Sequence, residues 1–179
     1  VWVRGDLEAR DALATLCTGA DAVIHVAGVV NADRAGFALG NIEGTRTMLA
    51  AAQGAGVRRF VHVSSLAARE PELSAYGWSK AEGDALVMAS GLDWAIVRPP
   101  AIYGPGDLEM LELFKLASKG LAVMPRAGRV SLLEVGDLGR LLLALAVTDG
   151  CNQILDADDG VAGGWSHKAF AQAIGTAMG

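Results

Sequence analysis

The sequence predicts an α/β protein built on a parallel sheet with helices on both faces. Short segments rich in Val and Ile alternate with amphipathic stretches along the whole chain, and this alternation favours βα units. Several short segments are apolar at every position, as strands buried on both faces are. The chain has 179 residues, 52% of them hydrophobic and 20% charged, which suffices for one domain with a sizeable core.

The predicted strands share β-branched side chains and turn residues at their ends. They cover Val1–Arg4, Ala22–Ala27, Val57–Ser64, Trp94–Arg98, Leu121–Met124, Val130–Leu133 and Gln153–Asp156. The predicted helices lie between them, at Glu8–Leu16, Gly36–Ala52, Ser74–Ser90, Asp107–Ser118, Val135–Val147 and Trp165–Met178. Gly91 is expected to end the helix that begins at Ser74, because glycine adopts the left-handed conformation of a helix end.

Composition excludes several classes of function. Fifteen Lys and Arg against twenty Asp and Glu give a net charge of −5, which provides no basic stripe for nucleic acid. Cys17 and Cys151 match no metal spacing and form no disulfide framework, so no metal and a cytoplasmic location are predicted. The longest apolar run, Leu141–Val147, is far shorter than the roughly 18–20 residues that span a bilayer. We therefore expect a small-molecule substrate, and neither nucleic acid nor membrane as partner.

One pattern carries chemistry: Tyr76-Gly-Trp-Ser-Lys80 on a predicted helix. The i,i+4 spacing places the phenol and the ammonium on one face. A nearby ammonium stabilises a phenolate, so Tyr76 is able to exchange a proton with a carbonyl or alcohol oxygen. The same spacing also occurs by chance on solvated helix faces, and this alternative stays open for the pattern alone.

Ser65 adds context to that pattern. It follows the predicted strand Val57–Ser64, and the carboxyl ends of parallel strands are where open α/β sheets bind ligands. Ser65 is therefore expected to bond to the same substrate oxygen as Tyr76. The alternative is that Ser64 and Ser65 only cap the end of the strand.

A strand, Ser65, Tyr76 and Lys80 in this order resemble the short-chain dehydrogenase/reductases. The chain is most similar to their extended branch of NAD-dependent epimerases/dehydratases and 3β-hydroxysteroid dehydrogenases. Four further stretches resemble motifs of that branch: Gly5-Asp6-Leu7, His25-Val26-Ala27-Gly28, Asn41-Ile42-Glu43-Gly44-Thr45 and the RPPAIYGPG segment at 98–106. The five motifs occur in the family's order over residues 1 to about 147.

The resemblance implies a Rossmann-like doubly wound sheet, bound NAD or NADP, and hydride transfer between nicotinamide and a secondary alcohol or ketone. It makes Tyr76 the general acid/base, with Lys80 binding the nicotinamide ribose and Ser65 orienting the substrate, and it counts Asn41, near the active site, among the catalytic residues. It also implies that Asp6 holds the adenine. The implied cofactor contacts are Asp6, Leu7, Val26, Ala27, Gly28, Tyr76, Lys80, Pro99, Ala101 and Ile102.

The chain departs from the family at its start, because the glycine-rich turn that cradles the pyrophosphate is absent from the sequence. The resemblance therefore implies a longer natural chain, with strands 1 and 2 on roughly 50–60 further residues. Val1–Arg4 then has no neighbouring strand, and Ala22–Ala27 becomes an apolar edge. Residues 1–147 are expected to be a partial NAD(P)-binding domain and 148–179 the start of a short C-terminal substrate lobe.

Three functions stay open. The first is an oxidoreductase for a steroid-like or small apolar substrate, since no diphosphate clamp is evident. The second is a nucleotide-sugar epimerase or dehydratase, which uses the same tyrosine and lysine. The third is a non-catalytic NAD(P)-binding module that senses redox state, against which the retention of Ser65, Tyr76 and Lys80 argues. Helices Gly36–Ala52 and Ser74–Ser90 resemble the family's dimer seam, so a homodimer is one option.

The remaining polar residues are assigned structural roles. His25 and His62 lie inside apolar strands, and we expect each to be buried with one hydrogen bond rather than catalytic. Arg126 and Arg129 flank Gly128, and a surface position is favoured for them over contact with a polar substrate.

Overall fold

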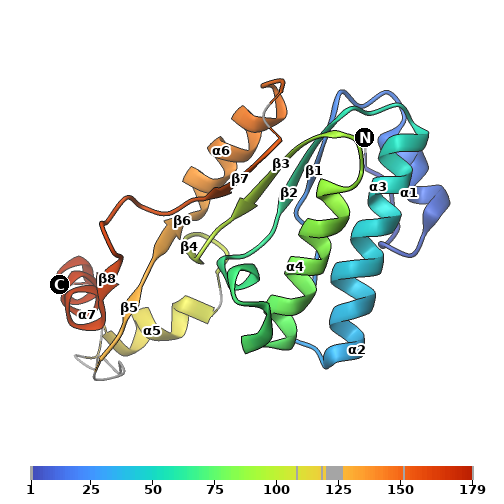
Figure 1. The fold of residues 1–179 in the computed structure, drawn as a ribbon. Coiled ribbons are helices and arrows are strands. Elements are labelled where there is room, and N and C mark those ends of the chain that lie inside the picture. The colour runs from blue at the N-terminus through green and yellow to red at the C-terminus, as the bar shows by residue number, and fades with distance from the viewer. Residues whose placement is uncertain (1, 108, 118, 120–126, 151, 179) are drawn as a thin grey trace. The chain divides into compact units, whose positions relative to one another are not determined.

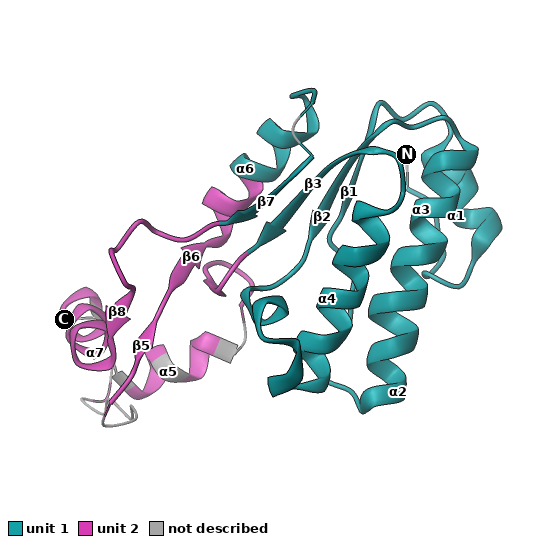
Figure 2. Ribbon diagram, viewed as in Figure 1, with its two compact units in different colours: residues 1–98, 140–156 teal, residues 99–139, 157–179 magenta. Residues whose placement is uncertain are grey.

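The computed structural model describes residues 2–107, 109–117, 119, 127–150 and 152–178. The chain divides into two compact units, one of residues 1–98 and 140–156 and one of residues 99–139 and 157–179 (Figure 2). Each is described by itself below. The domain boundary near residue 147 stays a prediction.

The first unit contains a four-stranded parallel sheet, which confirms the predicted fold class (Figure 1). Its strands lie in the order β1 (Ala22–His25), β2 (Arg59–Val63), β3 (Asp93–Arg98) and β7 (Gln153–Asp156). Every residue of β2 is buried, as expected of a central strand covered on both faces. The register aligns His25 with His62 across β1 and β2.

Helices cover both faces of this sheet. The helices of the first unit are α1 (Arg10–Cys17), α2 (Arg34–Phe37), the π-helical turn η1 (Ala38–Glu43), α3 (Gly44–Gly54), the 3₁₀ turns η2 (Leu66–Arg69) and η3 (Pro71–Leu73), α4 (Ala75–Met88) and, from residue 140, α6 (Val135–Ala146). Side chains of α1, α3 and α4 pack with Phe60 and Ile96 in one core. Arg59 is out of phase with Phe60, and its Nε donates to Leu145 O at 2.7 Å. Since alternate residues of a strand point to opposite faces, α6 covers the other face.

Strand β1 is the outer strand of the sheet, and its apolar edge is open as expected. Val26, just beyond the strand, is 59% exposed and Ile24 is 39% exposed. The predicted strand at Val1–Arg4 is wrong, because residues 2–7 form no strand. A strand is held by hydrogen bonds to a neighbour, and none of the described strands pairs with these residues.

The second unit is built from short pairings. Strand β4 (Ala101–Tyr103) pairs in parallel with β6 (Leu132–Glu134), and β5 (Arg129–Val130) pairs antiparallel with β8 (Trp165–Ser166). Its helices are α5 (Glu109–Ala117) and α7 (His167–Met178). Leu132, Phe170 and Ile174 form its core.

Several predictions for this second unit need correction. The strand predicted at Val130–Leu133 is split between β5 and β6, and β4 and β8 were not predicted. Arg129 is exposed, as predicted, and donates to the carbonyl oxygens of Gly163 and Gly164. The predicted strand Leu121–Met124 and Arg126 lie outside the described residues. None of the described helices is long and apolar enough to cross a membrane.

Candidate active site and cofactor site

Lys80 is a buried cation on α4. Its side chain is 6% exposed, and Nζ donates to Val63 O at 2.8 Å, at the carboxyl end of β2. Burial lowers the pKa of Lys80 from 10.5 to about 8, and the charge of Asp84 opposes that shift. The fold thus holds an ammonium group against the end of the central strand.

Tyr76 lies one helical turn before Lys80. Ser74 caps α4 by accepting a hydrogen bond from Gly77 N at 2.9 Å, so Tyr76 falls in the first turn, as its spacing from Ser74 predicts. The half-buried tyrosine ring packs on Phe37, with the ring centres 5.7 Å apart. Both residues of the Tyr76–Lys80 pattern therefore lie on one helix, close to its capped end.

Ser65 lies in the segment that leads from β2 to η2. Its backbone is extended, and its Oγ accepts from Ala67 N at 3.2 Å, which caps the 3₁₀ turn. Ser64 N donates to Val97 O at 2.8 Å, so the sheet holds this segment up to the residue before Ser65. Figure 1 shows the segment that follows β2 beside the first turn of α4.

Gly77 permits this close approach. A Cβ added there would lie 2.6 Å from Ala67 O and 3.1 Å from Ser74 Oγ. Because the first neighbour is a backbone atom, it has little room to shift. The lack of a side chain at Gly77 therefore sets how closely the Ser65 segment packs on the helix of Tyr76.

We expect Gly77→Ala to destabilise the protein by about 1–3 kcal/mol through overpacking, although alanine favours a helix by about 1 kcal/mol. Gly139→Ala on α6 is the matched control, since an added Cβ meets nothing within 4 Å there, and it should be neutral or stabilising. Urea unfolding of both variants measures the difference. Equal stability changes would contradict the proposed close packing at Gly77.

Asn41 links three elements. Its Oδ1 accepts from Val29 N at 2.7 Å, and its Nδ2 donates to Val29 O and to Ser79 Oγ, both at 2.9 Å. Ser79 Oγ in turn donates to Tyr76 O at 2.8 Å. The π-helical turn η1 places Asn41 between the loop after β1 and helix α4, and such turns are frequent at functional sites.

The two strand histidines stack beneath this site. Their ring centres are 5.4 Å apart. Thr45 Oγ1 donates to Asn41 O at 2.7 Å and lies 3.2 Å from His25 Nε2, so His25 carries its proton on Nε2 and donates to Thr45. Burial and the charge of Lys80 lower the pKa of His25 to about 4. Both histidines are buried as predicted, but neither nitrogen of His62 has a hydrogen-bond partner in the described part of the chain.

Sequence analysis missed Ser79 and Asp84. Asp84 is 1% exposed and forms an ion pair with Arg98, with Oδ2 2.8 Å from Nη2. A usable signal was present, since an acidic residue four positions after Lys80 shares its helix face. No comparable signal marked Ser79, whose role depends on Asn41, 38 positions away.

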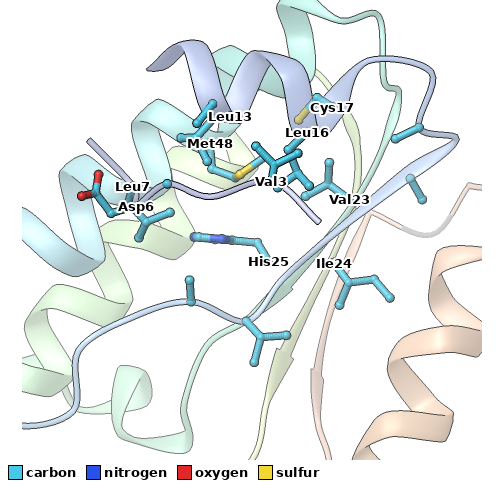
Figure 3. Close-up of a pocket in the computed structure, with 16 residues that line it drawn as sticks. Val3, Asp6, Leu7, Leu13, Leu16, Cys17, Val23, Ile24, His25 and Met48 are labelled. Carbon is cyan, nitrogen blue, oxygen red and sulfur yellow. The ribbon is translucent and has the colours of Figure 1, made fainter. Parts of the chain in front are cut away.

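A pocket of about 510 Å³ lies along the open edge of β1 (Figure 3). Leu13, Leu16, Cys17 and Met48 gather at one side of it, and Asp6 and Leu7 lie at another. Four of the residues predicted to contact the cofactor line it: Asp6, Leu7, Val26 and Ala27. Asp6 Oδ1 also accepts from Glu8 N and Ala9 N, which fixes the carboxylate at the start of α1.

The residues of the first unit fit a dinucleotide. The pocket is apolar enough for an adenine ring and carries a carboxylate at its rim. A Cβ at Gly28 would lie 2.9 Å from Asn41 Oδ1 and 3.9 Å from Lys80 Nζ. Because glycine has no side chain, the backbone at Gly28 lies directly beside both polar groups. Pro99, Ala101 and Ile102 belong to the second unit, and their predicted cofactor contacts stay a prediction.

Comparison with known proteins agrees with this geometry. The profile of a family described as NAD(P)H-binding matches residues 1–114. The ceramide reductase of Caulobacter vibrioides is 47% identical over 149 residues, which are 82% of this chain and 47% of that protein. A dTDP-glucose 4,6-dehydratase of Streptomyces niveus is 32% identical over 126 residues, which are 58% of this chain and 38% of that protein. The chain thus spans less than half the length of these relatives.

The fold is also shared with a solved structure. The Bordetella bronchiseptica enzyme WbmH in complex with NAD⁺ superposes with a TM-score of 0.85 over 98% of this chain and 65% of that chain, at 23% identity. The fold and the family match together confirm the resemblance inferred from the five motifs. The chain belongs to the NAD(P)H-binding family, among the short-chain dehydrogenase/reductases related to the NAD-dependent epimerases/dehydratases.

Proposed function

We propose that the protein is an extended short-chain oxidoreductase that transfers hydride between NAD(P) and a ketone or secondary alcohol on an apolar substrate. The observation that carries the proposal is the placement of Tyr76 and Lys80 on one face of α4, with the Ser65 segment packed on the first turn of that helix. The ceramide reductase relative supports the apolar substrate class, which also includes steroid-like ketones.

In the direction of ketone reduction, each site residue has a separate role. The bound nicotinamide supplies the hydride. Tyr76 donates its phenolic proton to the carbonyl oxygen, so the O–H bond of the phenol breaks and one forms on the product alcohol. Lys80 stabilises the resulting phenolate by its charge, and the hydroxyl of Ser65 orients the carbonyl. Asp6, Leu7, Val26, Ala27 and Gly28 hold the adenine and ribose side of the cofactor.

Asn41 receives a positioning role in this proposal. Both hydrogens of its amide and one lone pair of its oxygen are used by Val29 and Ser79. It therefore holds the loop after β1 against the helix of Tyr76 rather than contacting the substrate. This assignment is narrower than the catalytic role that the resemblance implied.

The second candidate is a nucleotide-sugar dehydratase, which the Streptomyces niveus relative favours. Such a reaction would start with a transient oxidation in which bound NAD(P)⁺ accepts the hydride and the same tyrosine, assisted by the lysine, accepts the proton; the hydride returns to the sugar afterwards. Net consumption of NAD(P)H therefore separates the two functions.

The test follows NADH and NADPH fluorescence in parallel, with energy transfer from the tryptophans reporting binding. We expect stoichiometric loss of one of the two reduced cofactors with a long-chain amphiphilic ketone or a 3-ketosteroid, and none with a dTDP- or UDP-sugar. Conversion of a nucleotide sugar in a parallel assay with NAD⁺ or NADP⁺, without net formation of reduced cofactor, would refute the reductase proposal and support the dehydratase.

A further inference from the structure

A buried ion pair lies one helical turn beyond Lys80, on the side away from Tyr76. Asp84 Oδ2 accepts a hydrogen bond from Nε of Arg98 at 2.9 Å, and Nη2 of the same guanidinium lies 2.8 Å from it in an ion pair. The side chain of Asp84 is 1% exposed and that of Arg98 is 16% exposed. A carboxylate buried this deeply keeps its charge only beside a cation, and Arg98 fixes it at the end of β3.

The second carboxylate oxygen is not used by Arg98. Asp84 Oδ1 makes no hydrogen bond to any described residue, and His62 Nε2 lies 3.7 Å from it. Burial holds the pKa of His62 well below its usual 6.5, so the imidazole is neutral at neutral pH. The buried hydroxyl of Ser64 makes no hydrogen bond to a described residue either.

Lys80 lies within reach of this negative charge. Lys80 and Asp84 are four residues apart on α4, which places them on one face, and both are buried. Burial raises the pKa of Asp84, and the charge of Lys80 acts against that shift. Asp84 in turn raises the pKa of Lys80 against its own burial. Each charge thus favours the ionised form of the other group.

The surroundings of Lys80 contain no second anion among the described residues. The charged or titratable groups that interact with it are Asp84 on α4, His25 on β1 and His62 on β2. Tyr76 lies one helical turn before it, Asn41 Oδ1 approaches the same glycine, Gly28, as Lys80 Nζ, and Arg98 on β3 is paired with Asp84. His25 and His62 are neutral at neutral pH, and Arg98 is a cation. Asp84 is therefore the one described group that offsets the positive charge of Lys80.

We propose that Asp84 is the counter-charge of Lys80 and a positioning residue of the active site, with Arg98 fixing its carboxylate beneath the Tyr76–Lys80 face of α4. The catalytic part of this assignment rests on the proposed function, because it acts through Lys80 on the phenolate of Tyr76. The charge coupling between Asp84 and Lys80 does not rest on it, and it is measurable without cofactor or substrate.

The test is an NMR titration of the lysine ¹³Cε signals in the purified protein, from about pH 6 to about pH 11. The chain has only four lysines, and Lys115, Lys119 and Lys168 are exposed, so they serve as internal references. We expect Lys80 to titrate near pH 8 in the natural protein. Asp84→Asn should lower its midpoint by about one pH unit or more, because a close opposite charge has been removed.

The direction of the shift separates coupling from loosened structure. A variant that merely opened the site would hydrate Lys80 and move its midpoint upward, toward 10.5. Asp93→Asn is the matched control: it removes a carboxylate from the ion pair with Arg59, at the other end of β3 and about 16 Å from Arg98. It should leave Lys80 unchanged. An unchanged or raised Lys80 midpoint in Asp84→Asn overturns the proposal.

A second measurement needs no variant and decides the case if Asp84→Asn does not fold. The ¹³Cγ signal of Asp84 should show an inflection at the pH where Lys80 titrates, because each group senses the charge of the other. A flat Asp84 signal across that pH overturns the coupling. If Asp84 and Lys80 are coupled but the protein reduces no ketone, the proposed function is refuted and the assignment of Asp84 as the counter-charge of Lys80 still holds. Failure of the proposed function and failure of this assignment are therefore distinguishable.

Discussion

Replacing Tyr76 with phenylalanine should lower kcat/KM for ketone reduction by about 10²–10⁴-fold, the range that a positioned general acid contributes. The substitution removes one oxygen and keeps the ring that packs on Phe37. Burial of α4 and its Ser74 cap are unaffected, so the folded state and NAD(P)H binding should change little. Steady-state kinetics with a saturating cofactor measure the effect.

Trp78→Phe is the control for this experiment. Trp78 lies on the same helix two residues later, and its ring stacks under the guanidinium of Arg34 at 3.8 Å, away from the proposed site. Its turnover should stay within about twofold of the natural protein. If Tyr76→Phe keeps turnover within about tenfold, Tyr76 is not the general acid. Normal cofactor binding with no turnover in the natural protein would instead favour the redox-sensing module.

The parts of the site that follow from local signals could be predicted from the sequence. Helix α4 is marked by a capping serine at Ser74 and by Gly91, which has the left-handed φ of +73° expected at a helix end. Tyr76 and Lys80 share its face because their spacing is fixed by the helix itself. The strands that carry His25 and His62 could also be predicted, because their apolar runs are continuous.

The parts that depend on distant partners could not be predicted. The helix predicted at Gly36–Ala52 contains the π-helical turn of Ala38–Glu43, and its residue Asn41 is held by Val29 and Ser79. Val1–Arg4 has a strand-like composition, but its described residues 2–4 form no strand, because pairing depends on a neighbour rather than on propensity. The Asp84–Arg98 pair joins α4 to β3 in the same way.

Lys80→Met should remove a large part of the pH dependence of the free energy of unfolding. The pKa of Lys80 is about 8 in the folded protein because of burial, and 10.5 is its ordinary value in the unfolded chain. Between these values the unfolded state binds more protons, so the stability of the natural protein rises as the pH rises. The shift of the pKa from 10.5 to about 8 corresponds to ~3 kcal/mol in the free energy of unfolding. Below pH 8 the protein carries the full cost of burying the ammonium group.

Methionine fills a similar volume without a charge, so the variant lacks this pH-dependent penalty. The lost hydrogen bond to Val63 O and the lost attraction to the charge of Asp84 lower stability by an amount that hardly varies above pH 7. The free energy of unfolding of the natural protein relative to Lys80→Met should therefore increase by ~3 kcal/mol between pH 7.5 and 10.5, as measured by urea unfolding. Lys115→Met, at an exposed position on α5, should show no such change. The contrary outcome is that the free energy of unfolding varies with pH in the same way for Lys80→Met and for the natural protein. Lys80 would then not be held as a buried cation, and the phenolate of Tyr76 would lack the charge that the proposed mechanism requires.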